Sequence, residues 1–253
     1  MKKAVFLTTY NRLPYLQQVL ESWSNVRGSE DWDFYAMIEP SPVASQIVEE
    51  FEEFKSRNSH LFRNFTIWVN PQVYGVLHHP WVGFERLLKM NNYDFAVRAE
   101  DDLMVSDDIL EFFSWAAEEY RGDDQVVTAH AFSLDDGDPS ISRASEAFSP
   151  WLWGTWKDDW STLIGPTWDH NYSTYNGTPG HQSGWDWNLN TRLFPEYDLR
   201  SVCPVVSRVQ NIGVTGVHGT PENFSQAPSF LSHRDKVSWT RADSIPHGRS
   251  ESS

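Results

Sequence analysis

Short apolar runs alternate with longer amphipathic segments over residues 1–130, and this alternation permits few architectures. The apolar runs have the length and composition of buried β-strands, and they cover residues 4–8, 33–38, 65–69, 94–99 and 125–130. Segments with helical periodicity lie between them, with starts expected at Pro14, at Ser41 and Pro42, near Trp81 and at Ser106. Strands that alternate with helices predict an α/β fold, in which a mostly parallel sheet is covered by helices on both faces.

The second half of the chain has a different composition. From residue 131 onward it is rich in Trp, Gly, Pro, Asn and Ser and shows few periodic runs. Residues 165–184 predict a long loop, and loops of that length in compact proteins often bind ligands. We expect residues 1–242 to form one domain and residues 243–253 to form a flexible tail.

The composition of the chain limits which partners it can bind and where in the cell we expect it. The formal net charge is −15, with 35 acidic and 20 basic residues, which argues against non-specific binding to nucleic acid. Cys203 is the only cysteine, so no disulfide can form within the chain. The apolar run at residues 4–8 is far shorter than the core of a signal peptide or a membrane span. We therefore expect a cytoplasmic protein without a transmembrane segment.

Three consecutive acidic residues, Glu100, Asp101 and Asp102, follow the fourth predicted strand. On an extended segment the first and third side chains point to the same side, so Glu100 and Asp102 can share one face of a cleft. Like charges this close repel one another unless a cation lies beside them. A hard divalent ion binds one or two carboxylates and completes its shell with phosphate oxygens, such as those of a nucleotide diphosphate. The alternative is a solvated turn whose acids stabilise the start of the next helix.

Four stretches of the sequence resemble known enzymes. Residues 5–23, "VFLTTYNRLPYLQQVLESW", and residues 93–113, "YDFAVRAEDDLMVSDDILEFF", resemble the GT-A nucleotide-sugar glycosyltransferases. The second of these is most similar to the N-acetylglucosaminyltransferase I-like branch. Residues 151–160, "WLWGTWKDDW", and residues 201–219, "SVCPVVSRVQNIGVTGVHG", resemble segments of bacterial family 2-like glycosyltransferases related to that branch. The four stretches occur in the same order as in the family.

The resemblance implies a GT-A fold and an inverting, metal-dependent transfer from a UDP-sugar, or a related nucleotide sugar, to a hydroxyl group of a glycan or another acceptor. Residues 1–100 would bind the nucleotide, and residues 101–242 would hold the metal and shape the acceptor site. Mn²⁺ or Mg²⁺ would bind Asp102, with His218 as a second contact to the metal or the diphosphate. The residues implied to contact the donor are Thr8, Tyr10, Arg12, Glu39, Glu100, Asp101 and Arg208.

Structural roles are the alternatives for several of these residues. Thr8 and Tyr10 can instead pack on the first helix, and Arg208 can instead form an ion pair. A lone histidine such as His218 is also commonly structural.

Asp186 is the residue implied to act as general base, because it lies where the family places a Trp-Asp pair. Its neighbours Trp185 and Trp187 would partly desolvate the carboxylate and raise its pKa. With Trp153, they are also expected to contact the acceptor. The competing base is Asp158 or Asp159, and Asp186 can alternatively be an acid that stabilises a helix start.

Two other functions fit the same residues. A carbohydrate-binding protein that keeps the fold without turnover would account equally well for the 13 tryptophans. A sugar nucleotidyltransferase would also hold a carboxylate-bound metal beside a nucleotide, and it would release pyrophosphate from a nucleoside triphosphate.

Overall fold

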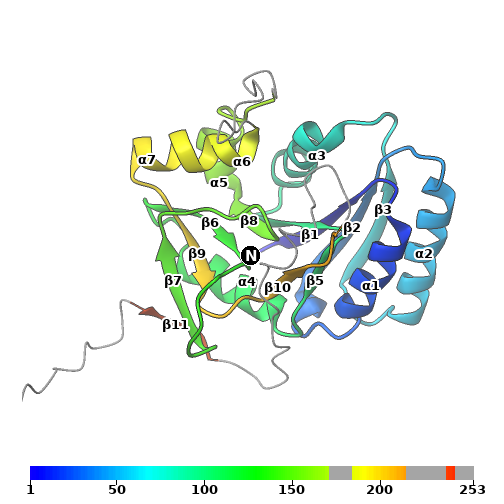
Figure 1. Ribbon diagram of the computed structural model, residues 1–253, viewed down its shortest axis with the longest axis horizontal. Coiled ribbons are helices and arrows are strands. Elements are labelled where there is room, and N and C mark those ends of the chain that lie inside the picture. Colours follow the sequence, from blue (N-terminus) through cyan, green and yellow to red (C-terminus); the bar gives the residue numbers. More distant parts are fainter. Residues whose placement is uncertain (171–183, 215–237, 243–253) are drawn as a thin grey trace, which may run out of the picture.

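The computed structural model describes residues 1–170, 184–214 and 238–242, and a nine-stranded sheet runs through its centre (Figure 1). The strands are β1 (Lys3–Thr9), β2 (Trp32–Ile38), β3 (Asn64–Val69), β4 (Phe95–Glu100), β5 (Leu103–Val105), β6 (Val126–His130), β7 (Ile141–Ser145), β8 (Trp153–Trp156), β9 (Arg200–Pro204), β10 (Val209–Asn211) and β11 (Thr240–Arg241). Their order in the large sheet is β11-β7-β9-β6-β8-β4-β1-β2-β3, and β5 pairs with β10 separately. β4, β1, β2 and β3 are parallel, whereas β8 is inserted antiparallel between β4 and β6. The predicted α/β fold with a mostly parallel sheet is confirmed.

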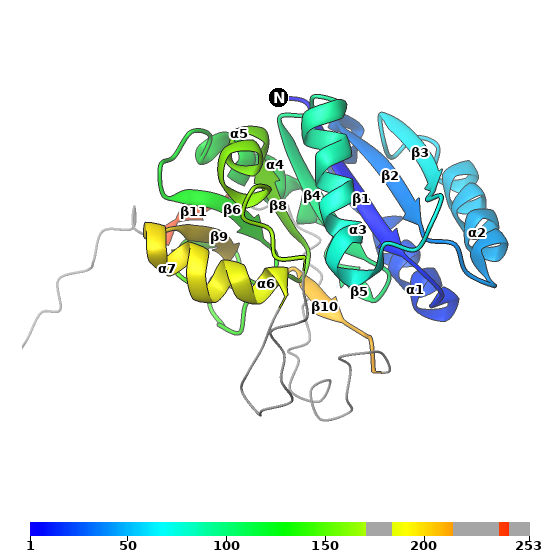
Figure 2. The same ribbon diagram turned by 90° about the horizontal axis from the view of Figure 1, so that it is seen from above.

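Helices cover both faces of this sheet (Figures 1 and 2). One face carries α1 (Leu13–Trp23), α2 (Ala44–Arg57) and α4 (Ile109–Glu119). The other face carries α3 (Gly75–Phe84), α5 (Lys157–Asp159), α6 (Trp185–Asn188) and α7 (Phe194–Tyr197). Three π-helical segments extend these helices: Glu85–Met90 after α3, Trp160–Ile164 after α5, and Leu189–Leu193 between α6 and α7. A single 3₁₀ turn, Ser29–Asp31, precedes β2.

Alternation along the strands produces two hydrophobic cores. In β1, Val5 and Leu7 pack toward α1 and α2, whereas Ala4 and Phe6 pack toward α3. The approach of α3 to β1 is close, because a Cβ atom added to Gly83 would lie 2.2 Å from the ring of Phe6. The glycine therefore lets the helix pack directly on the aromatic ring.

The five predicted strands are confirmed as β1, β2, β3, β4 and β6, but three predicted helix starts are wrong, and α3 begins at Gly75 instead of near Trp81. α2 begins at Ala44 and α4 at Ile109, and neither Ser41 nor Ser106 caps a helix with its side chain. The hydroxyl of Ser106 instead donates to the carboxylate of Asp108 at 2.6 Å.

The second half of the chain is more regular than its composition suggests, since β7 to β9 join the large sheet and α5 to α7 cover it. Residues 171–183 of the predicted loop and residues 243–253 of the predicted tail lie outside the described residues. In the described part of the chain, no helix combines the length and apolar character that crossing a bilayer requires.

Candidate active site

The carboxyl ends of β1, β2 and β4 lie side by side, and we call this side of the sheet the carboxyl edge. In the strand register, Thr8 of β1 is level with both Met37 of β2 and Glu100 of β4. Ligands bind at such an edge in open α/β sheets. Most of the predicted donor and metal residues meet here, namely Thr8, Tyr10, Arg12, Glu39, Glu100, Asp101 and Asp102.

Arg12 ties the two aspartates of this edge together. It lies at the N-cap of α1, and its Nη1 donates to Oδ2 of Asp102 at 2.7 Å while Nη2 donates to Oδ1 of Asp101. The hydroxyl of Thr9 donates to the second oxygen of Asp101 at 2.8 Å. Burial raises the pKa of Asp101, and the positive charge of Arg12 acts in the opposite direction. Asp102 is the more accessible of the two, with 12% of its side chain exposed against 2% for Asp101.

The segment after β10 covers Asp102 from another side. The backbone N–H of Ile212 donates to the carbonyl oxygen of Asp102 at 2.8 Å. A Cβ atom on Gly213 would lie only 2.4 Å from Oδ2 of Asp102. Glycine is therefore needed at position 213 so that the chain can pass the carboxylate.

Glu100 lies on the same face of β4 as Arg98, a residue that the sequence analysis missed. Nη2 of Arg98 lies 2.9 Å from Oε2 of Glu100, and its guanidinium carbon lies 5.4 Å from the centre of the Trp185 ring. Burial raises the pKa of Glu100, and Arg98 opposes that effect. The sequence does contain a signal for this pair. Arg98 is a cation inside an otherwise apolar strand, two residues before Glu100, and a buried charge requires a partner of opposite charge.

Glu39 positions the start of α3. Its Oε1 accepts the backbone N–H groups of Tyr74 at 2.7 Å and Gly75 at 2.8 Å. Nδ1 of His79 lies 3.6 Å from the same oxygen. Burial lowers the pKa of His79 to about 3, so the imidazole is neutral at pH 7 and this contact is not an ion pair. Glu39 thus fixes the loop that borders the carboxyl edge.

Thr8, near the end of β1, and Tyr10, directly after the strand, are both predicted to contact the donor but differ in accessibility. Tyr10 is 41% exposed and presents its ring at the carboxyl edge. Thr8 is 7% exposed, and its hydroxyl donates to the carbonyl oxygen of Ala99 at 3.2 Å. Tyr10 is therefore the one that offers a surface to a ligand.

Two of the three predicted acceptor tryptophans belong to the core, which corrects that prediction. Trp153 is 0% and Trp185 4% exposed, and their rings stack at 5.5 Å. Trp168 also stacks on Trp185, with 4.7 Å between the ring centres. The indole N–H of Trp185 donates to the carbonyl oxygen of Val76, which ties α6 to the start of α3. Of the three, only Trp187, at 39% exposed, has a ring that a ligand can reach.

Asp186 lies in the first turn of α6 and is partly exposed. Its neighbour Trp185 contacts Arg98, which is paired with Glu100, so this turn is held near the carboxyl end of β4. Figures 1 and 2 show α6 beside α3. The fold thus brings the predicted base to the same edge as the predicted metal ligand.

Asp158 and Asp159 lie at the opposite edge. β8 is antiparallel to β4, and Trp156 at its end pairs with Phe95 at the start of β4. The two aspartates follow directly, so the length of β4 separates them from Asp102. Burial and the charge of Asp158 raise the pKa of Asp159 to about 7. A raised pKa alone does not make a base, and this position corrects the alternative assignment.

We expect Asp159→Asn to stabilise the protein by about 1–2 kcal/mol at pH 8, because asparagine avoids a half-buried negative charge. The pKa of Asp159 is higher in the folded than in the unfolded state, so the folded state binds more protons between pH 4 and 7. The stabilisation should therefore fade as the pH falls through this range. Urea unfolding of the wild type and the variant at pH 8 and pH 4 measures this stabilisation. An equal stabilisation at both pH values would contradict the raised pKa of Asp159.

Arg208 lies in the interior instead of at the predicted donor site. Its side chain and that of Asp108 are both 0% exposed, and Nε of Arg208 lies 3.0 Å from Oδ2 of Asp108. The two terminal nitrogens donate to the carbonyl oxygens of Val206 and Pro139, each at 2.7 Å. With its donors engaged in this way, Arg208 joins three segments of the chain, and this structural role replaces the predicted contact with the donor.

Arg208→Met should lower the free energy of unfolding by about 3 kcal/mol, because it leaves the carboxylate of Asp108 buried without its cation. The double variant with Asp108→Asn should lose less, since no charge remains buried. Urea unfolding measures both. The folded fraction of Arg208→Met should bind UDP with Mn²⁺ as the wild type does, and a selective loss of UDP affinity would restore the donor role.

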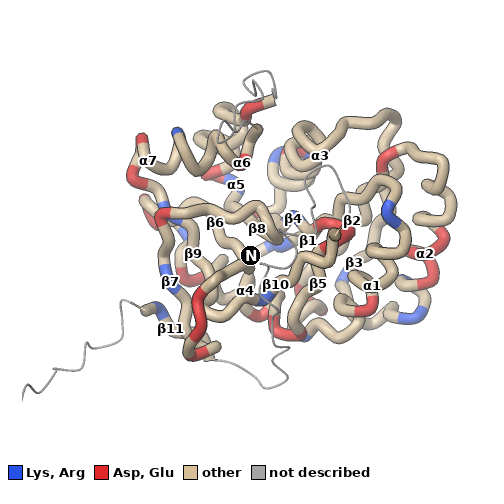
Figure 3. The backbone as a smooth tube through the Cα atoms, viewed as in Figure 1, with Lys and Arg blue, Asp and Glu red and all other residues tan. Residues whose placement is uncertain are grey.

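A divalent ion fits Asp102 only together with ligands from a substrate. The described residues hold no group of three or more His, Cys, Asp and Glu side chains arranged for a metal. One accessible carboxylate is nevertheless sufficient for an ion that takes its remaining ligands from phosphate oxygens and water. His218, the second predicted contact, lies outside the described residues. Acidic residues elsewhere are scattered over the surface, including α2 (Figure 3).

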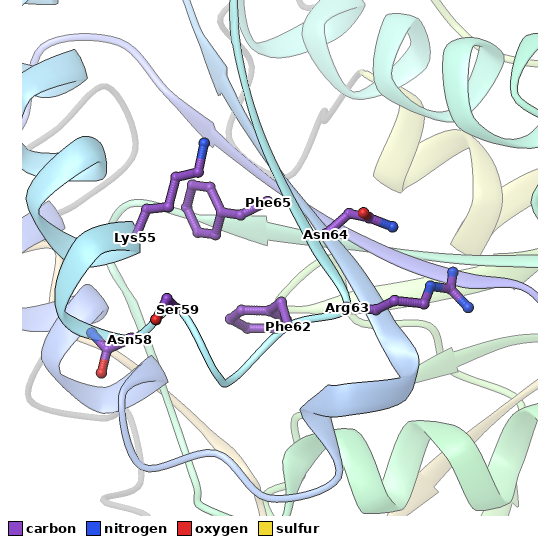
Figure 4. A pocket seen from close by; sticks show the side chains of 7 residues that line it. All are labelled: Lys55, Asn58, Ser59, Phe62, Arg63, Asn64 and Phe65. Carbon is purple, nitrogen blue, oxygen red and sulfur yellow. The ribbon is translucent and has the colours of Figure 1, made fainter.

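A hollow of about 250 Å³ opens far from this site (Figure 4). It is lined by Lys55, Asn58, Ser59, Phe62, Arg63, Asn64 and Phe65. Asn64 begins β3 and pairs with Asp33 near the start of β2, so the hollow lies at the amino ends of the strands. It is therefore separate from the carboxyl edge.

The fold matches those of solved glycosyltransferases, although no family model and no curated protein matches the sequence. The mannosyltransferase PcManGT from Pyrobaculum calidifontis, in complex with GDP-Man and Mn²⁺, superposes with a TM-score of 0.55 and 13% identity, covering 81% of this chain and 56% of its own. S. aureus TarS 1-349 gives a TM-score of 0.52 and 13% identity, covering 83% of this chain and 59% of its own. TarS 1-349 in complex with UDP superposes with a TM-score of 0.54 and 14% identity, again covering 83% of this chain and 59% of its own.

This chain thus spans less than two thirds of the length of the structures it matches. At these identities the likeness concerns the architecture. The chain thus shares the architecture of these solved glycosyltransferases.

Proposed function

We propose that this protein is a metal-dependent glycosyltransferase that moves a sugar from a UDP-sugar, or a related nucleotide sugar, to a hydroxyl group with inversion at the anomeric carbon. The observation that carries the proposal is the Asp101–Asp102 pair at the end of β4, held beside the end of β1 by Thr9 and Arg12. The ligands of the structurally similar proteins support it, since PcManGT was solved with GDP-Man and Mn²⁺ and TarS with UDP.

Asp102 would bind Mn²⁺ or Mg²⁺ together with the diphosphate of the donor. An ion at this place supplies positive charge that stabilises the leaving diphosphate. Tyr10 and Glu100 would contact the nucleotide and its sugar, and Glu39, which is 3% exposed, would hold the loop that borders them. The sequence resemblance to the inverting N-acetylglucosaminyltransferase I-like branch supports these roles.

Asp186 would accept the proton of the acceptor hydroxyl as general base. Its place beside Trp185, near the end of β4, supports this role. Trp187 would offer its exposed ring to an acceptor sugar, because aromatic rings pack well against the apolar face of a sugar.

Calorimetric titration with UDP, in the presence and absence of Mn²⁺, tests donor binding. Release of UDP from a panel of UDP-sugars and of GDP from GDP-mannose then tests turnover. Metal-dependent binding followed by release supports the proposal. Binding without release under any condition would indicate a carbohydrate-binding protein, and pyrophosphate release from UTP would indicate a nucleotidyltransferase.

A further inference from the structure

Arg12 already binds one carboxylate oxygen of Asp102, the proposed metal ligand, and one of Asp101. Its Nη1 lies 2.7 Å from Oδ2 of Asp102, and its Nη2 binds Oδ1 of Asp101. One planar guanidinium thus forms two charge-assisted hydrogen bonds, which are among the strongest that side chains make. The Arg12 side chain is 30% exposed, so solvent and ligands can reach this contact.

Oδ2 of Asp102 is approached from two sides. Nη1 of Arg12 donates to it, and Gly213 lies so close that an added Cβ atom would be 2.4 Å away. A divalent ion that binds Oδ2 therefore competes with Nη1 of Arg12. Two cations held side by side would also repel each other.

We infer that Arg12 is a resident counter-cation that keeps Asp102 closed to free divalent ions until a nucleotide diphosphate arrives. This inference rests on the proposed metal site at Asp102. The diphosphate supplies oxygen ligands to the ion and offers the displaced guanidinium a new anionic partner, so exchange becomes favourable only when both bind. Arg12 would then contact the donor, and metal and nucleotide would bind cooperatively.

Binding of Mn²⁺ alone, followed by electron paramagnetic resonance of the free ion, tests the inference. Arg12→Gln should bind Mn²⁺ without nucleotide at least about tenfold more tightly than the wild type, because Asp102 is released. Arg12→Lys retains a cation and should stay closer to the wild type. The double variant Arg12→Gln, Asp102→Asn should lose this gain in Mn²⁺ affinity. That loss distinguishes binding at Asp102 from weak binding elsewhere on the acidic surface.

Arg27→Gln is the matched control, since Arg27 is also 30% exposed and pairs with Glu111 at 3.2 Å; this variant should bind Mn²⁺ as the wild type does. Thermal melting verifies that each variant is folded. If the wild type binds Mn²⁺ with UDP, but folded Arg12→Gln binds Mn²⁺ alone no more tightly than the wild type, the inference is wrong and the proposed function still stands. If the wild type binds no Mn²⁺ even with UDP, both the inference and the proposed function fall.

Discussion

Asp186→Asn is expected to leave the affinity for UDP with Mn²⁺ unchanged and to reduce transfer by about 10²–10⁴-fold, the usual contribution of a general base. Asparagine keeps the size of the side chain but cannot accept a proton at neutral pH. Asp186 lies in the first turn of α6, whereas the predicted donor residues lie at or just after the ends of β1, β2 and β4, so the two functions can be separated. An effect on the rate without an effect on donor binding is the signature of a group that acts in the transition state.

The rate is measured as UDP release from the nucleotide sugar that the wild type turns over, with titration of UDP as the binding control. Asp158→Asn is the matched substitution, because it removes the same charge at the opposite edge of the sheet. It should retain normal activity. Near-normal turnover by Asp186→Asn would reject this residue as the base without returning the role to Asp158 or Asp159.

Asp102→Asn should abolish the dependence of UDP affinity on Mn²⁺. When the metal is present, the affinity for UDP should fall by at least about 100-fold. The substitution removes the accessible negative charge that would hold the ion and leaves a weaker amide oxygen. Asp101 cannot replace it, because its side chain is 2% exposed and is held by Thr9 and Arg12.

Titrating UDP with and without Mn²⁺ into the wild type and the variant gives this result directly. Thermal melting shows whether the unpaired Arg12 destabilises the fold. If folded Asp102→Asn bound UDP in a metal-dependent manner with wild-type affinity, the ion would have to bind elsewhere.

The first half of the fold is predictable from the sequence because each local pattern agrees with the whole. Buried parallel strands appear as continuous apolar runs, and residues 4–8 and 94–99 form β1 and β4 accordingly. The position of Glu100 at a strand end then follows from the sequence, whereas the pairing of β4 with β1, which brings Glu100 level with Thr8, appears only in the folded sheet.

Features that depend on distant contacts are not visible in this way. The short run that forms β8 gives no sign that it will enter the sheet antiparallel between β4 and β6. This insertion buries Trp153 and places Asp159 at the far edge, so a tryptophan-rich segment that suggests an acceptor surface proves to be core. The pairing of Arg208 with Asp108 likewise joins residues that only the folded chain brings together.

A crystal of the protein soaked with UDP and MnCl₂ shows whether Asp102 binds the metal, because anomalous scattering locates manganese independently of any assumed ligand. We expect one strong peak about 2–2.5 Å from a carboxylate oxygen of Asp102, with phosphate oxygens of UDP as further ligands. A nucleotide bound at the carboxyl edge with the manganese away from Asp102, or with no manganese beside it, would disprove the proposed metal site.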